Sequence, residues 1–473
     1  MPDFVDPLSN RYKFLRDAYS GEGGFASGTY LVPHTRETDD KYNRRKMLAC
    51  YPNFVRKVVD SYLSHLFRRG PERDFEDDLY QAFCQDVDRL GTYIDDFMRR
   101  AFKLAMLLGA VYIIVDKPRE RAKNRADEIA RRLFPYLALR TPEDLVAYET
   151  DEAGRLTRIV FAERTMAGSL APSSEPEIRY RIFTDKTWAV AKDPQGKEPI
   201  EQGEHGLGEV PVAPLFSTDP LAPGELRPTP WIWDLARVNY DLYNALSELR
   251  ELFRSQTFSI LALPVRTPQE AEGLSDLTIS TENALPYNPE AGGVPSFIAP
   301  PEGPVRLYLE YIRELVGQIY RLANLEFTGG TQETGTARSG VALAFQFQEA
   351  NRTLAQMALF CEQTEYRIAR LVCRWMGKEF EGSITYPRDF SVMDLQQELK
   401  TAMDALSLQV SETFNREVKK LVARKVLGDT VDDEVLEKID AEIDAGSDPY
   451  AARLEEEIEG TPPRPSPERG GSR

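Results

Sequence analysis

The sequence predicts an α+β protein that is mainly helical. Two observations predict this class: apolar residues recur at helical spacing along most of the 473-residue chain, and a stretch within residues 136–190 instead alternates apolar and polar residues. Length is a third observation, because a chain this long exceeds what one hydrophobic core usually supports. We therefore expect several packed units, most of them helical.

The composition is that of a folded, acidic protein. Hydrophobic residues make up 42% of the chain, which is enough to build cores, and the formal net charge is -17. Such a surface disfavours nonspecific adhesion to nucleic acid. A protein of this charge that handles DNA has to guide or enclose it. We expect Cys50, Cys84, Cys361 and Cys373 to be buried free thiols, because they show no metal-binding or paired spacing.

The first part of the chain reads as helices followed by a buried strand. Helical patterns occur in residues 42–67, with an interruption at Pro52, and in residues 76–108. After Gly109, the chain continues as a strand at residues 110–115. The apolar positions of the first pattern are Met47, Phe54, Val58, Leu63 and Leu66. The run 104–115 is too short to span a bilayer, and residues 1–4 lack the features of a signal peptide.

Basic residues gather on these first helices. They are Arg44, Arg45, Lys46, Arg56, Lys57, Arg68 and Arg69. A nucleic-acid patch is one interpretation, and a solvated helix face or a subunit contact is the other. We favour the second, because aromatic residues do not alternate with the charges as a stacking platform requires.

Four short alternating stretches then predict a meander of strands. They are residues 145–148, 156–161, 178–183 and 187–190, with a hairpin turn at residues 151–154 and a last strand at 212–216.

A pair of long helices with an insertion between them comes next. Residues 231–258 contain no proline or glycine and predict a straight helix of about 40 Å. Residues 305–327 predict the helix that returns. Between them we expect a strand at 260–265, a short helix at 268–272 and strands near Leu277 and Val294. The two long helices should form an antiparallel stalk.

A glycine- and threonine-rich loop, residues 328–336, follows the stalk. Gly330 and Gly335 have the spacing of a phosphate-binding loop, but Thr336 and Ala337 stand where its lysine is needed. The segment before the loop also reads as helix rather than strand. We therefore favour a structural loop over a nucleotide site.

The last third of the chain is helical and becomes strongly acidic. Residues 341–376 predict a long helix whose buried stripe is Phe345, Leu354, Met357, Cys361, Ile368, Leu371 and Trp375. Residues 393–427 are again helical, and residues 429–459 carry 13 acidic and 2 basic side chains. We expect an anionic helix pair or fringe there. Residues 461–473 are too poor in apolar residues to fold alone.

No pattern in the chain predicts an active site. His34, His65 and His205 are far apart, and no catalytic serine, zinc or dinucleotide motif is present. Asp116, at the end of the buried strand, is the best-placed acid, and we expect it to serve as a strand-end cap or in an ion pair. The rival hypothesis is a metal-dependent hydrolase that uses Asp116 with Asp60 or Asp234. We expect no enzyme, no metal and no cofactor.

The order of these elements resembles that of the portal proteins of tailed double-stranded DNA bacteriophages. The residues that carry the resemblance are Tyr42, Asn43, Arg44, Arg45, Lys46, Tyr51, Pro52, Asn53, Val58, Val59 and Asp60, then residues 109–116 and 234–239, then Ser339, Gly340, Val341, Ala342 and Leu343. Their order and spacing cover most of residues 40–430.

The resemblance implies a portal fold that assembles as a ring. It maps residues 1–229 and 339–393 to the wing, 230–258 and 305–326 to the stem, and 259–304 to the clip. Residues 327–338 become the tunnel loop, 394–460 an acidic helical crown and 461–473 a disordered tail. The stem residues singled out are Trp231, Asp234, Asn239, Tyr311 and Tyr320.

The resemblance also implies a function. Twelve copies would form a channel at one capsid vertex, through which a terminase motor packages genomic double-stranded DNA that is later ejected. Implied partners are the terminase large subunit, the major capsid protein, scaffold and tail adaptors, in a virion assembled in the host cytoplasm. The alternative is a non-channel structural head or adaptor protein of a virion.

The tunnel loop would touch DNA without reading its sequence. Its residues are Thr328, Gly329, Gly330, Thr331, Gln332, Glu333, Thr334, Gly335, Thr336 and Arg338. The glycines make the loop pliable, and its polar side chains suit brief contacts with the DNA backbone.

Overall fold

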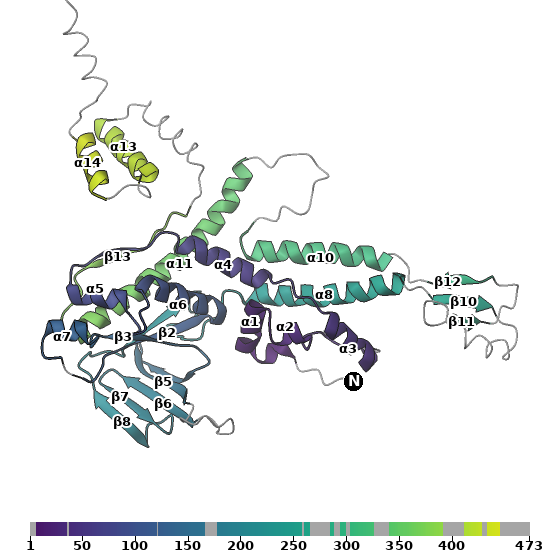
Figure 1. The fold of residues 1–473 in the computed structure, drawn as a ribbon, viewed down its shortest axis with the longest axis horizontal. Helices are drawn as coiled ribbons and strands as arrows, with labels where there is room; N and C mark the ends of the chain where they lie inside the picture. Colours follow the sequence, from purple (N-terminus) through teal and green to yellow (C-terminus); the bar gives the residue numbers. More distant parts are fainter. Residues whose placement is uncertain are drawn as a thin grey trace, which may run out of the picture. The chain divides into compact units, whose positions relative to one another are not determined.

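The computed structural model of the chain describes residues 6–35, 37–120, 122–165, 177–257, 260–264, 284–287, 294–298, 303–325, 340–390, 411–427 and 433–444. Residues 1–390 form one compact unit and residues 391–473 a second. Helices and antiparallel sheets both contribute, so the predicted α+β class is confirmed (Figure 1).

The first unit begins with short helices. They are η1 (Pro7–Ser9), α1 (Arg11–Ser20), α2 (Gly24–Ser27), α3 (Asp39–Leu48) and α4 (Phe54–Leu66). Thr38 and Asn53 cap α3 and α4, since their side chains accept hydrogen bonds from the amides of Lys41 and Arg56. The predicted interruption at Pro52 is confirmed. Met47, one of the apolar positions of the first helical pattern, is 85% exposed.

The predicted helical pair and buried strand are also confirmed. Helices α5 (Asp78–Gln85) and α6 (Ile94–Leu108) precede β2 (Ala110–Asp116). Gly109 makes the turn at φ 89°, and a Cβ atom there would lie 2.5 Å from the Pro228 carbonyl oxygen. Only glycine combines this conformation with so close a backbone approach.

Strand β2 lies at the centre of a three-stranded antiparallel sheet. Its neighbours are β3 (Tyr136–Arg140) and β9 (Val212–Phe216), and α7 (Arg125–Ala130) lies between β2 and β3 in the chain. The prediction that residues 212–216 form the last strand of the meander is wrong. The strand has three buried residues in five, and it pairs with β2, next to α6 and α11.

The meander is a five-stranded antiparallel sheet in chain order. Its strands are β4 (Leu145–Thr150), β5 (Leu156–Thr165), β6 (Glu177–Thr184), β7 (Thr187–Ala191) and β8 (Pro199–Glu204). The turn at 151–154 is confirmed, because the Asp151 carboxylate accepts from the amides of Ala153 and Arg155. Strand β8 was missed because five of its six residues are exposed.

The stalk consists of α8 (Trp233–Thr257) and α10 (Gly303–Leu322), which lie side by side (Figure 1). Between them in the chain, β10 (Ile260–Pro264) pairs in parallel with β11 (Ala284–Tyr287) and antiparallel with β12 (Ser296–Ile298). The expected helix at 268–272 and strand near Leu277 lie outside the described residues. Helix α10 ends earlier than expected, and Asn324 follows at φ 48°.

Helix α11 (Gly340–Trp375) passes through the main core. Leu354, Met357, Cys361, Ile368 and Leu371 are buried as predicted, and Trp375 is partly buried against the same core. After it, β13 (Ser383–Thr385) pairs with β1 (Glu72–Asp74).

Hydrogen bonds join parts of this core that are far apart in sequence. The Tyr62 hydroxyl donates to the Ala323 carbonyl at 2.7 Å, and Trp375 Nε1 donates to the Val115 carbonyl at 3.0 Å. Cys361 and Cys373 are buried free thiols as predicted, whereas Cys84 is only partly buried and Cys50 is exposed.

The second unit contains two described helices, α13 (Glu412–Leu427) and α14 (Asp433–Asp444). Lys420 pairs with Asp444 and Arg424 with Asp440, each at 2.6 Å, so the two helices run antiparallel. The predicted helix is confirmed over 412–427. Among the helices described here and in the first unit, none is both long and apolar enough to cross a membrane.

Candidate functional site

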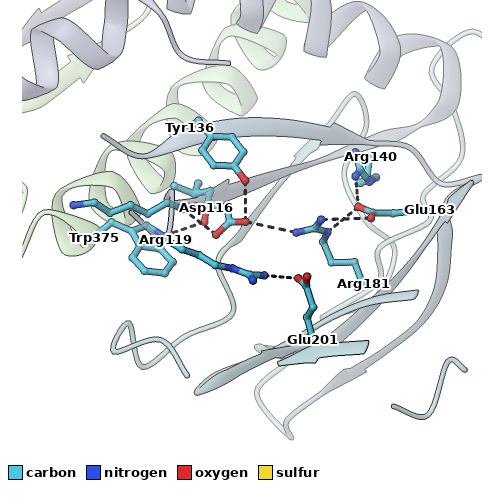
Figure 2. A network of polar contacts seen from close by, with 10 residues as sticks. Asp116, Arg119, Tyr136, Arg140, Glu163, Arg181, Glu201 and Trp375 are labelled. Carbon is cyan, nitrogen blue, oxygen red and sulfur yellow. Dashed lines mark hydrogen bonds and ion pairs between the residues drawn. The ribbon is translucent and has the colours of Figure 1, made fainter. Parts of the chain in front are cut away.

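Asp116, the acid singled out in the sequence, lies at the end of β2 in a network of polar contacts (Figure 2). Its Oδ1 accepts from the amide of Lys117 at 2.8 Å, and its Oδ2 accepts from the Tyr136 hydroxyl at 3.1 Å. Arg181 Nη1 lies 3.6 Å from the same Oδ2. The prediction of a strand-end cap and ion pair is therefore confirmed.

Further ion pairs continue the network across the meander. Glu163 accepts from Arg181 at 2.7 Å and also pairs with Arg140. Burial alone would raise the pKa of Glu163, but the hydrogen bond and charge of Arg181, together with Arg140, lower it. Burial, helped by Asp116, raises the pKa of Tyr136 to about 12. At neutral pH Glu163 is therefore charged and the Tyr136 hydroxyl is neutral, and the contacts of these groups join β2, β3, β5 and β6.

A hollow of about 870 Å³ adjoins the network. Arg119 forms part of its wall, pairing with Glu201 at 2.6 Å and lying over the Trp188 ring at 4.4 Å from its centre. Both signs of charge line the hollow, and its carboxylates at Asp116 and Glu128 already have cationic or hydroxyl partners. The arrangement favours a structural role for this network.

The metal-hydrolase hypothesis gains no support from the residues it named. Asp60 accepts a hydrogen bond from the Tyr19 hydroxyl at 2.8 Å, and Asp116 is engaged by Tyr136 and Arg181. No group of three or more histidine, cysteine, aspartate or glutamate residues with metal-binding geometry occurs in the part of the chain that the structure describes.

His205 is a buried histidine beside this network. Its Nε2 lies 3.1 Å from the Thr184 carbonyl oxygen, and its ring centre lies 6.1 Å from that of Trp375. Burial lowers the pKa of His205 from 6.5, and the contact with Thr184 opposes this only in part. The folded protein therefore holds the imidazole neutral at pH values where the unfolded chain protonates it.

We expect the free energy of unfolding to fall as pH falls below about 6.5, because the unfolded chain then binds a proton that the folded chain does not. Thermal unfolding of the His205→Gln variant between pH 7.5 and 5.5 should show a smaller decrease in Tm than the unmodified chain. The control is His34→Gln, at an exposed histidine. An equal decrease in His205→Gln and the unmodified chain would contradict the prediction.

Helix α8 packs against α1, α3, α4 and α10, and it leaves one side partly open towards its C-terminal end. Helix α3 covers one face, where Arg45 Nε donates to the Ser247 hydroxyl at 3.2 Å. Helix α10 covers another, where the Tyr308 hydroxyl donates to Glu248 at 2.7 Å. The third face carries Leu246, Leu249 and Phe253, three and four residues apart and so on one side of the helix.

The open face forms an apolar groove of about 280 Å³ that Leu48 and Cys50 complete. Phe253 at its edge is 46% exposed. On α10, Leu307 (66% exposed) and Tyr311 (49% exposed) are four residues apart and so lie on one side of the helix. Apolar groups exposed together are typical of protein–protein interaction sites and of ligand grooves.

The stem residues named from the sequence have different surroundings. Asn239 is fully buried. Its side-chain oxygen accepts hydrogen bonds from the Tyr51 hydroxyl and the Phe54 amide, each at 3.1 Å, and its side-chain nitrogen donates to the Pro52 carbonyl at 3.0 Å. Trp231 packs on Tyr62, and Tyr320 on Phe54. Asp234 is exposed in the first turn of α8, and Tyr311 is half-exposed. Asn239 thus anchors α8 to the corner before α4.

The tunnel-loop residues 328–336, with Arg338 and Ser339, lie outside the described residues. Gly340, Val341, Ala342 and Leu343 form the first turn of α11.

Of the basic residues on the first helices, Lys57, Arg68 and Arg69 are exposed as expected. Arg45 is the exception: it is 5% exposed and pairs with Glu37 at 2.6 Å, so it supports the core rather than a solvated face.

Comparisons with known proteins find likeness only among solved structures. No protein-family model matches the chain, and no curated protein sequence does. A chain from the "Virion of native gene transfer agent (GTA) particle" is 11% identical with a TM-score of 0.39, covering 88% of this chain and 99% of that one.

Two similar chains come from necks of the same kind of particle. One, from the neck of an empty particle computed with C6 symmetry, is 12% identical (TM-score 0.40, 78% of this chain and 88% of that one). The other, from the neck of a native particle computed with C12 symmetry, is 11% identical (TM-score 0.39, 77% and 88%). With TM-scores this low, the functional argument rests on this chain's own residues.

Proposed function

We propose that this chain is a portal protein. Twelve copies form a ring at one capsid vertex, and the axial channel admits genomic double-stranded DNA during packaging and releases it during ejection. The observation that carries the proposal is the α8–α10 stalk, which bears a small sheet between its helices and exposes apolar residues on two different faces.

Two different apolar faces favour a ring. One is the side of α10 that carries Leu307 and Tyr311, and the other is the groove of α8, where Leu249 is buried at the base and Phe253 is exposed at the edge. When one surface of a subunit binds a different surface of the next, assembly continues until the rotation closes. Self-complementary surfaces would instead give a dimer. The stalks of neighbouring copies would then line the channel.

The charge of the chain suits passage of DNA. A net charge of -17 disfavours tight binding of phosphate, so a duplex enclosed by such walls meets little attraction. The glycine-rich loop 328–336 supplies brief contacts, and Arg338 a local and reversible one. Packaging energy comes from a separate terminase motor, and this chain performs no catalysis and needs no cofactor.

The proposal gives the chain a setting of the same kind as the virion and neck structures named above. Its partners would be the terminase large subunit, the major capsid protein, scaffold and tail adaptors.

The mass and shape of the purified particle test the proposal. Native mass measurement and electron-microscope images of one sample should show a ring of about 640 kDa, twelve times the chain mass of 53.7 kDa, with an axial hole. A compact closed oligomer without a hole would contradict it and favour a non-channel adaptor.

A variant with a shorter tunnel loop tests DNA handling separately from ring assembly. Removing residues 328–336 should leave the ring mass unchanged and impair packaging or retention of DNA, because the channel loses its pliable contacts. The control removes the same number of residues from the 461–473 tail. Unchanged packaging by the loop variant would refute the role of the loop.

A further inference from the structure

Three arginines of α11 converge on one glutamate. Arg367, Arg370 and Arg374 are three and four residues apart, so they share a face of the helix. Glu209, on the turn before β9, lies 2.6 Å from both Arg370 and Arg374 and 3.8 Å from Arg367. Each of the four side chains is between 22% and 38% exposed.

The cluster has more positive than negative charge. Three guanidinium groups share one Glu209 carboxylate, and the well-exposed Glu379 lies 3.8 Å from Arg374. Glu225 also lines the hollow beside Arg367 and Arg370, where it accepts from the Leu221 amide at 2.7 Å. Arg367 and Arg370 are therefore undercompensated. Like charges held this close repel one another, and an additional anion beside them would reduce that repulsion.

Two of the guanidinium groups also have unused donors. The buried Nε–H groups of Arg367 and Arg370 meet no acceptor in the described part of the chain. Burial lowers the pKa of Arg367, and Glu209 only partly offsets this while Arg370 adds to it. A buried N–H donor without an acceptor has lost water without gaining a partner.

The side chains of Arg367 and Arg370 border a hollow of about 850 Å³. Arg367, Arg370, Gln363 and Tyr366 of α11 form one wall, and residues 220–226 form another. The volume is that of an ordinary ligand pocket. Leu221 on the second wall is exposed, so the hollow offers an apolar surface beside the guanidinium groups.

We propose that this hollow is an oxyanion-binding site in which Arg367 and Arg370 bind a carboxylate or phosphate group. The planar fork of arginine donors matches both groups geometrically. The oxyanion comes either free in solution, as phosphate, or as a carboxylate on an acidic segment of another protein chain. The site is separate from the stalk surfaces and does not depend on the portal assignment.

The test uses the full chain with two probes, inorganic phosphate and a hexaglutamate peptide, at matched ionic strength in chloride. Calorimetry and thermal unfolding should show saturable binding of at least one probe. Arg367→Gln should weaken that binding by about tenfold or more, because a charge-assisted contact is lost. Arg352→Gln is the matched control, since Arg352 lies on the same helix and pairs with Glu349 at 3.1 Å.

Glu209→Gln gives a second measurement that a purely structural role would not predict. Removing the competing carboxylate should tighten binding of the probe and make its stabilising effect on Tm larger than in the unmodified chain. This variant also keeps the test decisive if Arg367→Gln does not fold.

The outcomes separate the sources of the oxyanion. Binding of phosphate alone or of both probes supports a free oxyanion, and binding of hexaglutamate alone supports an acidic segment of another chain. The proposal is overturned if neither probe binds, if Arg367→Gln binds as well as Arg352→Gln, or if Glu209→Gln weakens binding.

Discussion

Replacing Leu307 and Tyr311 of α10 together by aspartate is expected to yield a folded monomer of 53.7 kDa in place of a ring. In the proposed ring these side chains lie against the next copy. Burying a large apolar side chain contributes about 1.5–3 kcal/mol, and burying an unpaired carboxylate instead costs several more. The loss is repeated at every interface of the ring.

Native mass measurement checks this expectation, and circular dichroism confirms that the variant is folded. The control is Leu90→Asp, which makes the same chemical change at a residue that is 84% exposed and outside the stalk. It should assemble as the unmodified chain does. A ring of unchanged mass in the double variant would show that the side of α10 with Leu307 and Tyr311 is not a subunit contact.

The second large effect concerns stability. Glu365 of α11 is fully buried, and its carboxylate accepts from Arg73 Nε at 2.5 Å and from the Tyr386 hydroxyl at 2.6 Å. Arg73 also pairs with the exposed Asp95 at 2.5 Å. Glu365→Gln removes the buried one of the two carboxylates that compensate Arg73 and is expected to lower the free energy of unfolding by about 3 kcal/mol or more. Denaturant unfolding under conditions that keep the chain monomeric measures the change.

Two further variants test the reason for that loss. Glu349→Gln, on the exposed side of the same helix, should change stability by less than about 1 kcal/mol. Arg73→Met combined with Glu365→Leu should be more stable than Glu365→Gln, because no uncompensated charge stays buried. Equal losses in Glu365→Gln and Glu349→Gln would contradict a structural role for the pair.

The long elements could be read from the sequence because their patterns are strong. Residues 231–258 and 341–376 contain many regularly spaced apolar residues, and the observed helices Trp233–Thr257 and Gly340–Trp375 differ from them by one or two residues at each end. The buried strand after Gly109 was equally clear, since six consecutive apolar residues follow a glycine turn.

The features that the sequence did not predict depend mostly on contacts between residues that are far apart in the chain. Residues 212–216 form a strand as expected, but pairing with β2 depends on residues about a hundred positions earlier. Strand β8 has almost no apolar residues, so alternation cannot reveal it. Arg45 is buried although we expect a solvated face there, because Glu37 offers its guanidinium group a buried partner.

The candidate sites were predictable to different degrees. Asp116 was placed correctly as a strand-end ion pair, because the end of a buried strand needs a polar residue that finds a partner. The arginine cluster was missed. The spacing of Arg367, Arg370 and Arg374 is visible in the sequence, but Glu209 and the hollow come from a distant segment.

The hydrogen bonds that close the main core also determine when it can form during synthesis. Tyr62 can form its hydrogen bond only after Ala323, 261 residues later, has been synthesised. Val115 can accept its hydrogen bond only after Trp375, 260 residues later, has been synthesised. At about 5–20 residues per second, a ribosome needs on the order of tens of seconds to supply these partners. During that interval α11 does not yet cover the apolar faces of α4, α6 and β2. Residues 1–229 made alone would stay in that incomplete state, exposed to aggregation and to chaperones.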